Sequence, residues 1–176
     1  SWDSPVSHED KLVAIVAEGV EFLGASEHAV VFDYAPTIEA LGLGAHVAGF
    51  GGIEVTTWDY GHFNIFPLIP DGSINGGTVD WAGGDEGLSL PTPQLFQAYR
   101  DKGARLIQVS HPRARGTFTF QQHFDRIGLH FDFARGVAEG VDALMPLPRS
   151  MLRLPSVGPL FTDAFEAIEI YNGFQL

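Results

Sequence analysis

Residues 47–68 read VAGFGGIEVTTWDYGHFNIFPL and contain two predicted strands joined by a turn. The first, 47–57, is rich in β-branched and apolar residues, and Gly51-Gly52 is expected at a bulge. Residues 58–61 have the composition of a turn, and 62–68 form the second strand. Glu54 is the one charged residue in the first strand. Since burying an ionised carboxylate is costly unless it is paired or metal-bound, Glu54 is a candidate functional residue.

Helices and short apolar strands alternate around this stretch, which favours βα units, a parallel sheet and one α/β domain over residues 1–176. Ser7 caps a predicted helix over 7–23, or a shorter helix that ends at Gly19 and precedes a strand over 20–25. The other predicted elements are a helix over 33–43 capped by Asp33, a long loop over 69–91, a helix from Thr92 to Gly103, strands over 104–109 and 167–171, and short helices near 120–127 and 133–144.

Composition limits the classes of partner. The chain holds 22 acidic and 10 basic residues for a net charge of −12, and residues 1–98 contain a single basic residue, Lys11. Nucleic acids and anionic membranes need clustered Lys and Arg, so neither is an expected partner. The chain has no cysteine, which excludes disulfides and thiolate ligands, and no stretch long and apolar enough to span a bilayer. The cellular compartment and the oligomeric state stay open.

Candidate metal ligands fall at or beside the ends of predicted strands: Glu27-His28, Glu54, His62 and His111. In parallel α/β folds the carboxyl ends of the strands build the site, and imidazole with carboxylate suits zinc, manganese or iron. The alternative is that the histidines are structural, and this is the preferred interpretation for His8, His46, His123 and His130. It predicts that Glu54 and the other three histidines lie far apart.

Other motifs that carry chemistry are missing. The sequence has no G-x-S-x-G elbow, no P-loop and no G-x-G-x-x-G fingerprint. Residues 71–76 resemble the start of a calcium loop, but the twelfth position is Ala82 where a bidentate Glu is required.

Five short segments follow one another along the chain: Glu27-His28, Gly52-Ile53-Glu54-Val55, Gly61-His62-Phe63-Asn64, Ser110-His111-Pro112-Arg113 and Ile168-Glu169-Ile170-Tyr171-Asn172-Gly173. In this order they resemble the motifs of the PHP (polymerase and histidinol phosphatase) metallohydrolases, most closely of their CehA/McbA-like branch. The resemblance covers nearly the whole chain, from about Asp3 to Gly173, and the order makes it more specific than any single motif.

The resemblance implies a distorted (β/α)7 TIM-like barrel, incomplete at both ends, with two or three divalent metal ions at the carboxyl ends of the strands. By position, Glu54 matches the bridging carboxylate. The other matched metal ligands are His28, His62, His111 and, in the first segment, Asp3. Arg113 is expected to hold an anionic group of a small substrate, since Arg suits phosphate oxygens. The implied activity is hydrolysis of phosphoesters, or of ester- or carbamate-like bonds, by a metal-activated hydroxide.

The sequence also departs from this family. Glu27 stands where the family usually has Asp, and the 176 residues contain neither the His-x-His nor the Asp-x-His that the family carries at its two ends. We expect the chain to be an internal piece of a longer protein, and a degenerate relative is the alternative. The alternative function is accordingly a catalytically inactive, PHP-like binding or interaction domain with an incomplete metal site.

Overall fold

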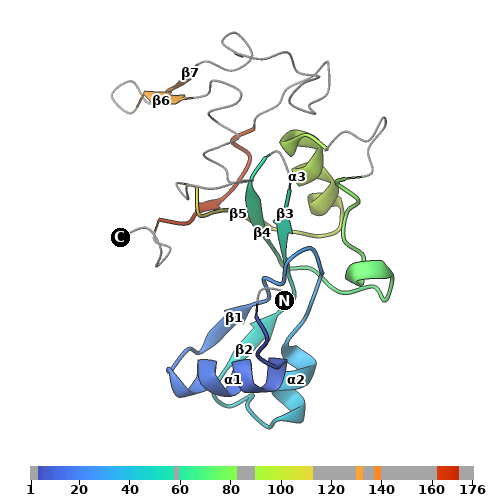
Figure 1. Ribbon diagram of the computed structural model, residues 1–176, viewed down its shortest axis with the longest axis vertical. Helices are drawn as coiled ribbons and strands as arrows, with labels where there is room; N and C mark the ends of the chain where they lie inside the picture. Colours follow the sequence, from blue (N-terminus) through green and yellow to red (C-terminus); the bar gives the residue numbers. More distant parts are fainter. Residues whose placement is uncertain are drawn as a thin grey trace.

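The computed structural model describes residues 4–57, 60–82, 90–112, 130–132, 137–139 and 162–170. The elements, in chain order, are α1 (His8–Ala17), β1 (Phe22–Gly24), α2 (Ala35–Ala40), β2 (Ala48–Phe50), β3 (Ile53–Thr56), β4 (His62–Phe66), the 3-10 helix η1 (Ile74–Gly76), α3 (Thr92–Asp101), β5 (Leu106–Ser110), β6 (His130–Asp132), β7 (Val137–Glu139) and β8 (Ala167–Ile168) (Figure 1). None of the helices described is long and apolar enough to cross a membrane.

The first part of the chain builds a small unit in which α1 and α2 lie beside the parallel pair β1–β2 (Figure 1). Ser7 is the N-cap of α1, as predicted, and its side chain accepts a hydrogen bond from the Asp10 N–H at 3.0 Å. The shorter of the two predicted helices is confirmed, because α1 stops before Gly19, which has a φ of +76°, and a strand follows. Leu12, Ala25, Tyr34, Ile38 and Val47 form the core of this unit.

The second sheet carries the order β3-β4-β5-β8. Neighbours among β3, β4 and β5 pair antiparallel, and β5 pairs with β8 in parallel. The prediction of a parallel sheet is therefore wrong for the first three strands. The link between β3 and β4, residues 57–61, is too short for the crossover that a parallel pair needs, so the chain folds back directly. The described strands close no barrel, and the (β/α)7 barrel stays a prediction.

The two faces of this sheet differ because side chains alternate along each strand. One face is apolar and fully buried, and it packs with Leu95, Phe96 and Tyr99 of α3; its members are Ile53, Val55, Phe63, Ile65, Ile107 and Val109. The opposite face has an apolar pair, Phe66 and Leu106, at one end and is polar along the rest, with Glu54 and Thr56 on β3, His62 and Asn64 on β4, and Gln108 and Ser110 on β5. The register of β3 and β4 sets Glu54 opposite Asn64 and Thr56 opposite His62. These polar side chains therefore lie next to one another on this face.

Several boundaries differ from prediction. The strand predicted over 47–57 is divided into β2 and β3 at Gly51-Gly52. The N-cap of α2 is Tyr34 and not Asp33 as predicted. The Asp33 carboxylate does accept a hydrogen bond from the Ala35 N–H at 2.9 Å. The helix predicted near 133–144 is wrong at Val137–Glu139, which form β7 instead. The helix predicted near 120–127 lies outside the described residues.

Candidate metal centre

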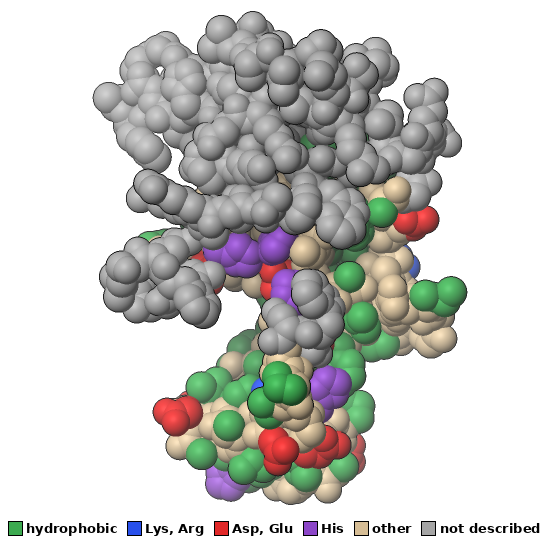
Figure 2. All heavy atoms as spheres, in the orientation of Figure 1, with side chains coloured by type: hydrophobic (Ala, Val, Ile, Leu, Met, Phe, Trp, Pro, Cys, Tyr) green, Lys and Arg blue, Asp and Glu red, His purple; other side chains and the backbone are tan. Residues whose placement is uncertain are grey.

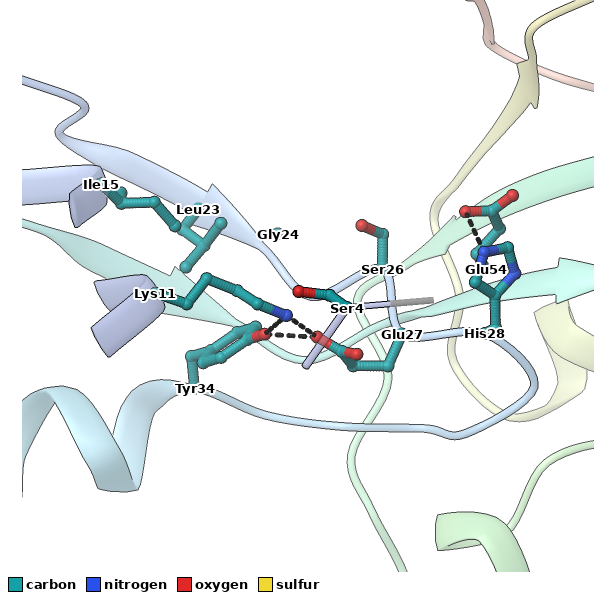
Figure 3. A pocket seen from close by; sticks show the side chains of 10 residues that line it. All are labelled: Ser4, Lys11, Ile15, Leu23, Gly24, Ser26, Glu27, His28, Tyr34 and Glu54. Atoms are coloured by element: carbon teal, nitrogen blue, oxygen red, sulfur yellow. Dashed lines mark hydrogen bonds and ion pairs between the residues drawn. The ribbon is translucent and has the colours of Figure 1, made fainter. Parts of the chain in front are cut away.

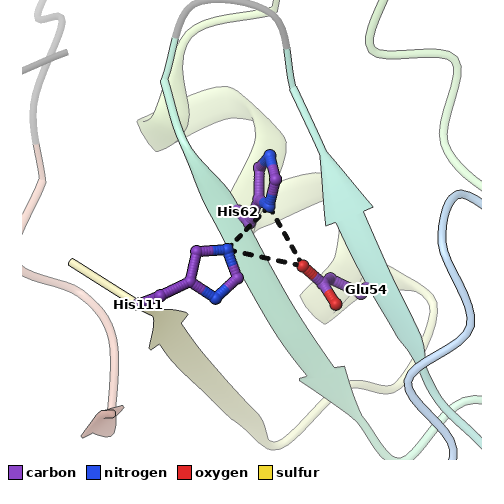
Figure 4. Close-up of side chains that lie close together, drawn as sticks. All are labelled: Glu54, His62 and His111. Carbon is purple, nitrogen blue, oxygen red and sulfur yellow. Dashed lines mark hydrogen bonds and ion pairs between the residues drawn. The ribbon is translucent and has the colours of Figure 1, made fainter. Parts of the chain in front are cut away.

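Glu54, His62 and His111 meet on the polar face of the second sheet (Figure 4). The Oε1 atom of Glu54 lies 3.1 Å from Nδ1 of His62 and 3.8 Å from Nε2 of His111. The two ring nitrogens lie 2.8 Å apart. One ligand atom from each residue falls within 4.8 Å of the other two, so a single cation between them is within reach of all three. The prediction that these residues lie far apart is therefore wrong.

The strand ends position these three side chains. Glu54 lies on β3 opposite Asn64 and His62 begins β4 opposite Thr56, so the antiparallel register makes them diagonal neighbours on the same face of the sheet. His111 follows β5 directly and has a φ of +31°, which is uncommon for a residue with a side chain. Ser110 is the ladder partner of His62. The turn at His111 thus sets its imidazole beside that of His62.

His28 approaches the same carboxylate from the first unit. Its Nε2 lies 3.9 Å from Oε2 of Glu54, the oxygen that does not face His62. The backbone forms a bridge between His28 and Glu54, and the Glu54 N–H and C=O bond Glu27 and Ala29 at 3.0 and 2.8 Å. Nδ1 of His28 lies 2.6 Å from the Thr56 hydroxyl oxygen, which holds the ring orientation.

Several polar atoms of this face are buried without a hydrogen-bond partner among the described residues. They are Nε2 of His62, Oδ1 of Asn64 and Oγ of Ser110, and in the described part of the chain Oε1 of Glu54 has no polar contact beyond the two imidazoles described above. Side chains at the centre keep only 13–20% of their surface exposed. A native fold leaves few buried polar atoms unpaired, and imidazole with carboxylate is a donor set that zinc, manganese or iron accepts. The three clustered residues could therefore hold a divalent metal ion. Figure 2 shows histidine and acidic side chains next to one another near the middle of the view.

Burial lowers the pKa of the His111 imidazole, and the neighbouring His62 lowers it further, while Glu54 and Glu169 act in the opposite direction. The folded state consequently takes up a proton on His111 at lower pH than the unfolded chain does, whose His pKa is about 6.5. In metal-free protein, the free energy of unfolding should fall as the pH drops below about 6.5, by at most about 1.4 kcal/mol per pH unit for one proton, until the lowered pKa is passed.

Urea unfolding at several pH values with EDTA present measures this dependence. His111→Gln should reduce the acid slope, and His46→Gln, which changes an exposed histidine, should leave it as in the parent protein. Equal slopes in all three proteins would show that His111 does not contribute.

A cavity of about 370 Å³ adjoins the centre and shares His28 and Glu54 with it (Figure 3). On its other wall, Nζ of Lys11 lies 2.9 Å from Oε1 of Glu27 and 3.2 Å from the Tyr34 hydroxyl, which itself donates to Glu27. Burial would raise the pKa of Glu27, but the hydrogen bonds from Tyr34 and Lys11 act in the opposite direction, and that pKa is lowered. Glu27 thus stays ionised and links α1 to the segment that follows β1.

The structure brings together His28, Glu54, His62 and His111 among the predicted ligands, and Asp3 and Arg113 lie outside the described residues. His8 packs against the rings of Phe32 and Tyr34, away from the cluster, which agrees with a structural role. Sequence reasoning did not single out Thr56 or Glu169. Glu169 carries the same signal as Glu54, an acidic residue between two β-branched apolar ones, here Ile168 and Ile170.

The chain matches no model of a protein family, no curated protein and no solved structure. The resemblance to PHP metallohydrolases therefore stays a prediction from the ordered motifs.

Proposed function

We propose that this chain belongs to a metal-dependent hydrolase that acts on phosphoesters, or on ester- or carbamate-like bonds, of a small substrate. The metal would be zinc, manganese or iron, held by His28, Glu54, His62 and His111. A divalent ion at such a site supplies Lewis acidity and lowers the pKa of a coordinated water, which makes a nucleophile near neutral pH. The proposal rests on the geometry of one carboxylate.

That carboxylate is Glu54, whose two oxygens face different imidazoles. Oε1 faces His62 and His111, while Oε2 faces His28. A carboxylate in this position can bridge two cations, one on each side, with a histidine beside each oxygen. A purely structural Glu–His pair needs only one of these contacts, and burying the Glu54 carboxylate brings a desolvation penalty that a bound cation would offset.

The remaining residues of the site would fix these donors and admit the substrate. The Thr56 hydroxyl holds Nδ1 of His28, so Nε2 is the nitrogen turned toward Glu54. The low exposure of the four side chains keeps most bulk water out, and the cavity beside His28 and Glu54 gives a small molecule access. Lys11 adds a positive charge to the cavity wall, although Glu27 partly neutralises it.

The test is a metal titration followed by an activity assay. Protein stripped with EDTA and desalted is titrated with Zn²⁺ and Mn²⁺ by isothermal calorimetry, and saturable binding with a Kd of about 1 μM or tighter is expected. Hydrolysis of bis(p-nitrophenyl) phosphate and of p-nitrophenyl acetate is then measured before and after metal is restored. Turnover of at least one substrate class should depend on added metal and should stop with chelator.

Two outcomes would contradict the proposal. Absence of saturable binding up to 1 mM metal would remove the metal site altogether. Stoichiometric binding without turnover of either substrate class would instead favour the alternative function, a metal-binding interaction domain without catalysis.

A further inference from the structure

Glu169 comes directly after β8, the strand drawn in red beside β5 in Figure 1, and it contacts His111 at the end of β5. Its Oε2 accepts a hydrogen bond from the His111 backbone N–H, and the same oxygen lies 3.4 Å from Nδ1 of the His111 ring. The carboxylate therefore contacts both the backbone and the side chain of one residue. Glu169 contacts Nδ1 of His111, whereas the other ring nitrogen, Nε2, faces Glu54 and His62, so Glu169 lies on the side of the ring away from the three clustered donors.

We propose that Glu169 is a positioning residue, which fixes the backbone, ring orientation and tautomer of His111 so that Nε2 is free to bind a metal ion. This inference rests on the proposed metal site. Two features of His111 call for such a residue: its backbone conformation and the direction of its two ring nitrogens.

The backbone of His111 is strained. A φ of +31° costs a residue with a side chain on the order of 1–2 kcal/mol and persists only where the surroundings enforce it. The strand ladder ends at Ser110, and the N–H of His111 bonds the Glu169 carboxylate instead of a neighbouring strand. The main chain of Glu169 is itself anchored, since its N–H donates to the Val109 carbonyl at 2.9 Å. Glu169 is thus bound to β5 through its main chain and stabilises the turn at His111 through its side chain.

The ring of His111 has two distinct environments. Nδ1 faces the Glu169 carboxylate, while Nε2 faces Nδ1 of His62 and Oε1 of Glu54. An ionised carboxylate can only accept a hydrogen bond, so it favours the neutral tautomer that has an N–H at Nδ1 and keeps the lone pair on Nε2. Metal-binding histidines typically donate their second nitrogen to a carboxylate in this manner, and loss of that partner weakens metal binding by about 10–100-fold.

The chain offers a matched control three residues earlier. Glu166 also accepts a backbone N–H of β5, that of Ile107 at 2.8 Å, and its other oxygen pairs with Arg100 at 2.7 Å. It therefore fastens the same segment to the same strand, but among the described residues its contacts with Arg100 and Ile107 involve no imidazole. If Glu169 only fastened this segment, Glu166→Gln and Glu169→Gln would have equivalent effects at the metal centre.

The first experiment measures Zn²⁺ affinity of the parent chain, Glu169→Gln and Glu166→Gln by competition with a chromophoric chelator. Glu169→Gln should bind about 10–100-fold more weakly, and Glu166→Gln should bind as the parent does. Glutamine retains an acceptor for the His111 N–H, so the variant is expected to fold, and circular dichroism checks this. Parent-like affinity in Glu169→Gln, or equal weakening in both variants, would overturn the inference. If the parent binds no Zn²⁺, the proposed function has failed instead.

The second experiment needs no metal. The ¹⁵N chemical shifts of the His111 imidazole distinguish the two neutral tautomers in metal-free protein above pH 7. The parent and Glu166→Gln should show hydrogen on Nδ1, and Glu169→Gln should shift the population toward hydrogen on Nε2. An unchanged tautomer in Glu169→Gln would contradict the positioning role, whatever the metal affinities are.

Discussion

Glu54→Gln should weaken metal binding by more than about 100-fold and abolish metal-dependent hydrolysis. The expected effect exceeds that of losing a residue that only orients a ligand, because Glu54 offers an oxygen to the imidazoles on both of its sides. A hundredfold change corresponds to about 2.7 kcal/mol of binding free energy. Glutamine keeps the size of the side chain but loses its charge, so it can neither bridge two cations nor neutralise them. Calorimetric titration with Zn²⁺ and Mn²⁺, followed by the ester and phosphodiester assays, measures both effects.

Glu39→Gln is the matched control, since it makes the same chemical change at an exposed position of α2. It should bind metal and hydrolyse substrate as the parent does. Thermal melts of both variants without metal separate lost binding from lost folding. If folded Glu54→Gln binds metal as tightly as the parent, Glu54 is not a ligand and the proposed site is wrong.

Gly51→Ala should destabilise the fold by about 3 kcal/mol, the upper end of the usual cost of overpacking. A Cβ at this position would lie 2.0 Å from the carbonyl oxygen of Leu68 and 3.2 Å from that of Phe32. Both are main-chain atoms, and the Leu68 N–H also donates to the Gly51 carbonyl at 2.9 Å, so neither neighbour can turn aside as a side chain could. The melting temperature should fall by roughly 6–12 °C for a chain of this size.

Gly44→Ala provides the comparison, because Gly44 lies in an exposed turn where an added Cβ meets no atom within 4 Å. Its φ is outside the left-handed range, so alanine should leave stability unchanged or raise it by up to about 1 kcal/mol. Similar melting temperatures for the two variants would show that the contact between Gly51 and Leu68 does not limit stability. Gly51 lies just before β3, which carries Glu54, so the metal affinity of Gly51→Ala should fall together with its stability.

Local signals in the sequence predicted much of the secondary structure. Ser7 and Gly19 mark the ends of α1, and the apolar runs around Phe63 and Ile107 coincide with β4 and β5. These features depend on neighbouring residues only: a capping hydroxyl, a backbone without Cβ, and alternation along a strand. Strand direction was predicted wrongly for β3, β4 and β5, although β1–β2 and β5–β8 do pair in parallel, because periodicity reports which face a side chain occupies and says nothing about how two strands run.

For the candidate site, too, local signals in the sequence identified some residues, and others depended on how the strands pair. Glu54 was identifiable because a lone carboxylate in an apolar strand needs a partner, and His28, His62 and His111 because they flank predicted strands. Thr56 and Glu169 were not identified as site residues. Their role depends on which ring nitrogen they face, and that is set by the pairing of β3 with β4 and of β5 with β8.

By itself, then, the sequence determined the kinds of donor that this protein can offer, oxygen and imidazole nitrogen without any thiolate, and the strand ends where they lie. Only the tertiary structure decided that one carboxylate lies between three imidazoles. The antiparallel register of β3 and β4, the turn at His111 and the bridge from His28 to Glu54 bring together residues up to 83 positions apart. Such proximity arises from hydrogen bonds between distant segments, which no local pattern of residues encodes.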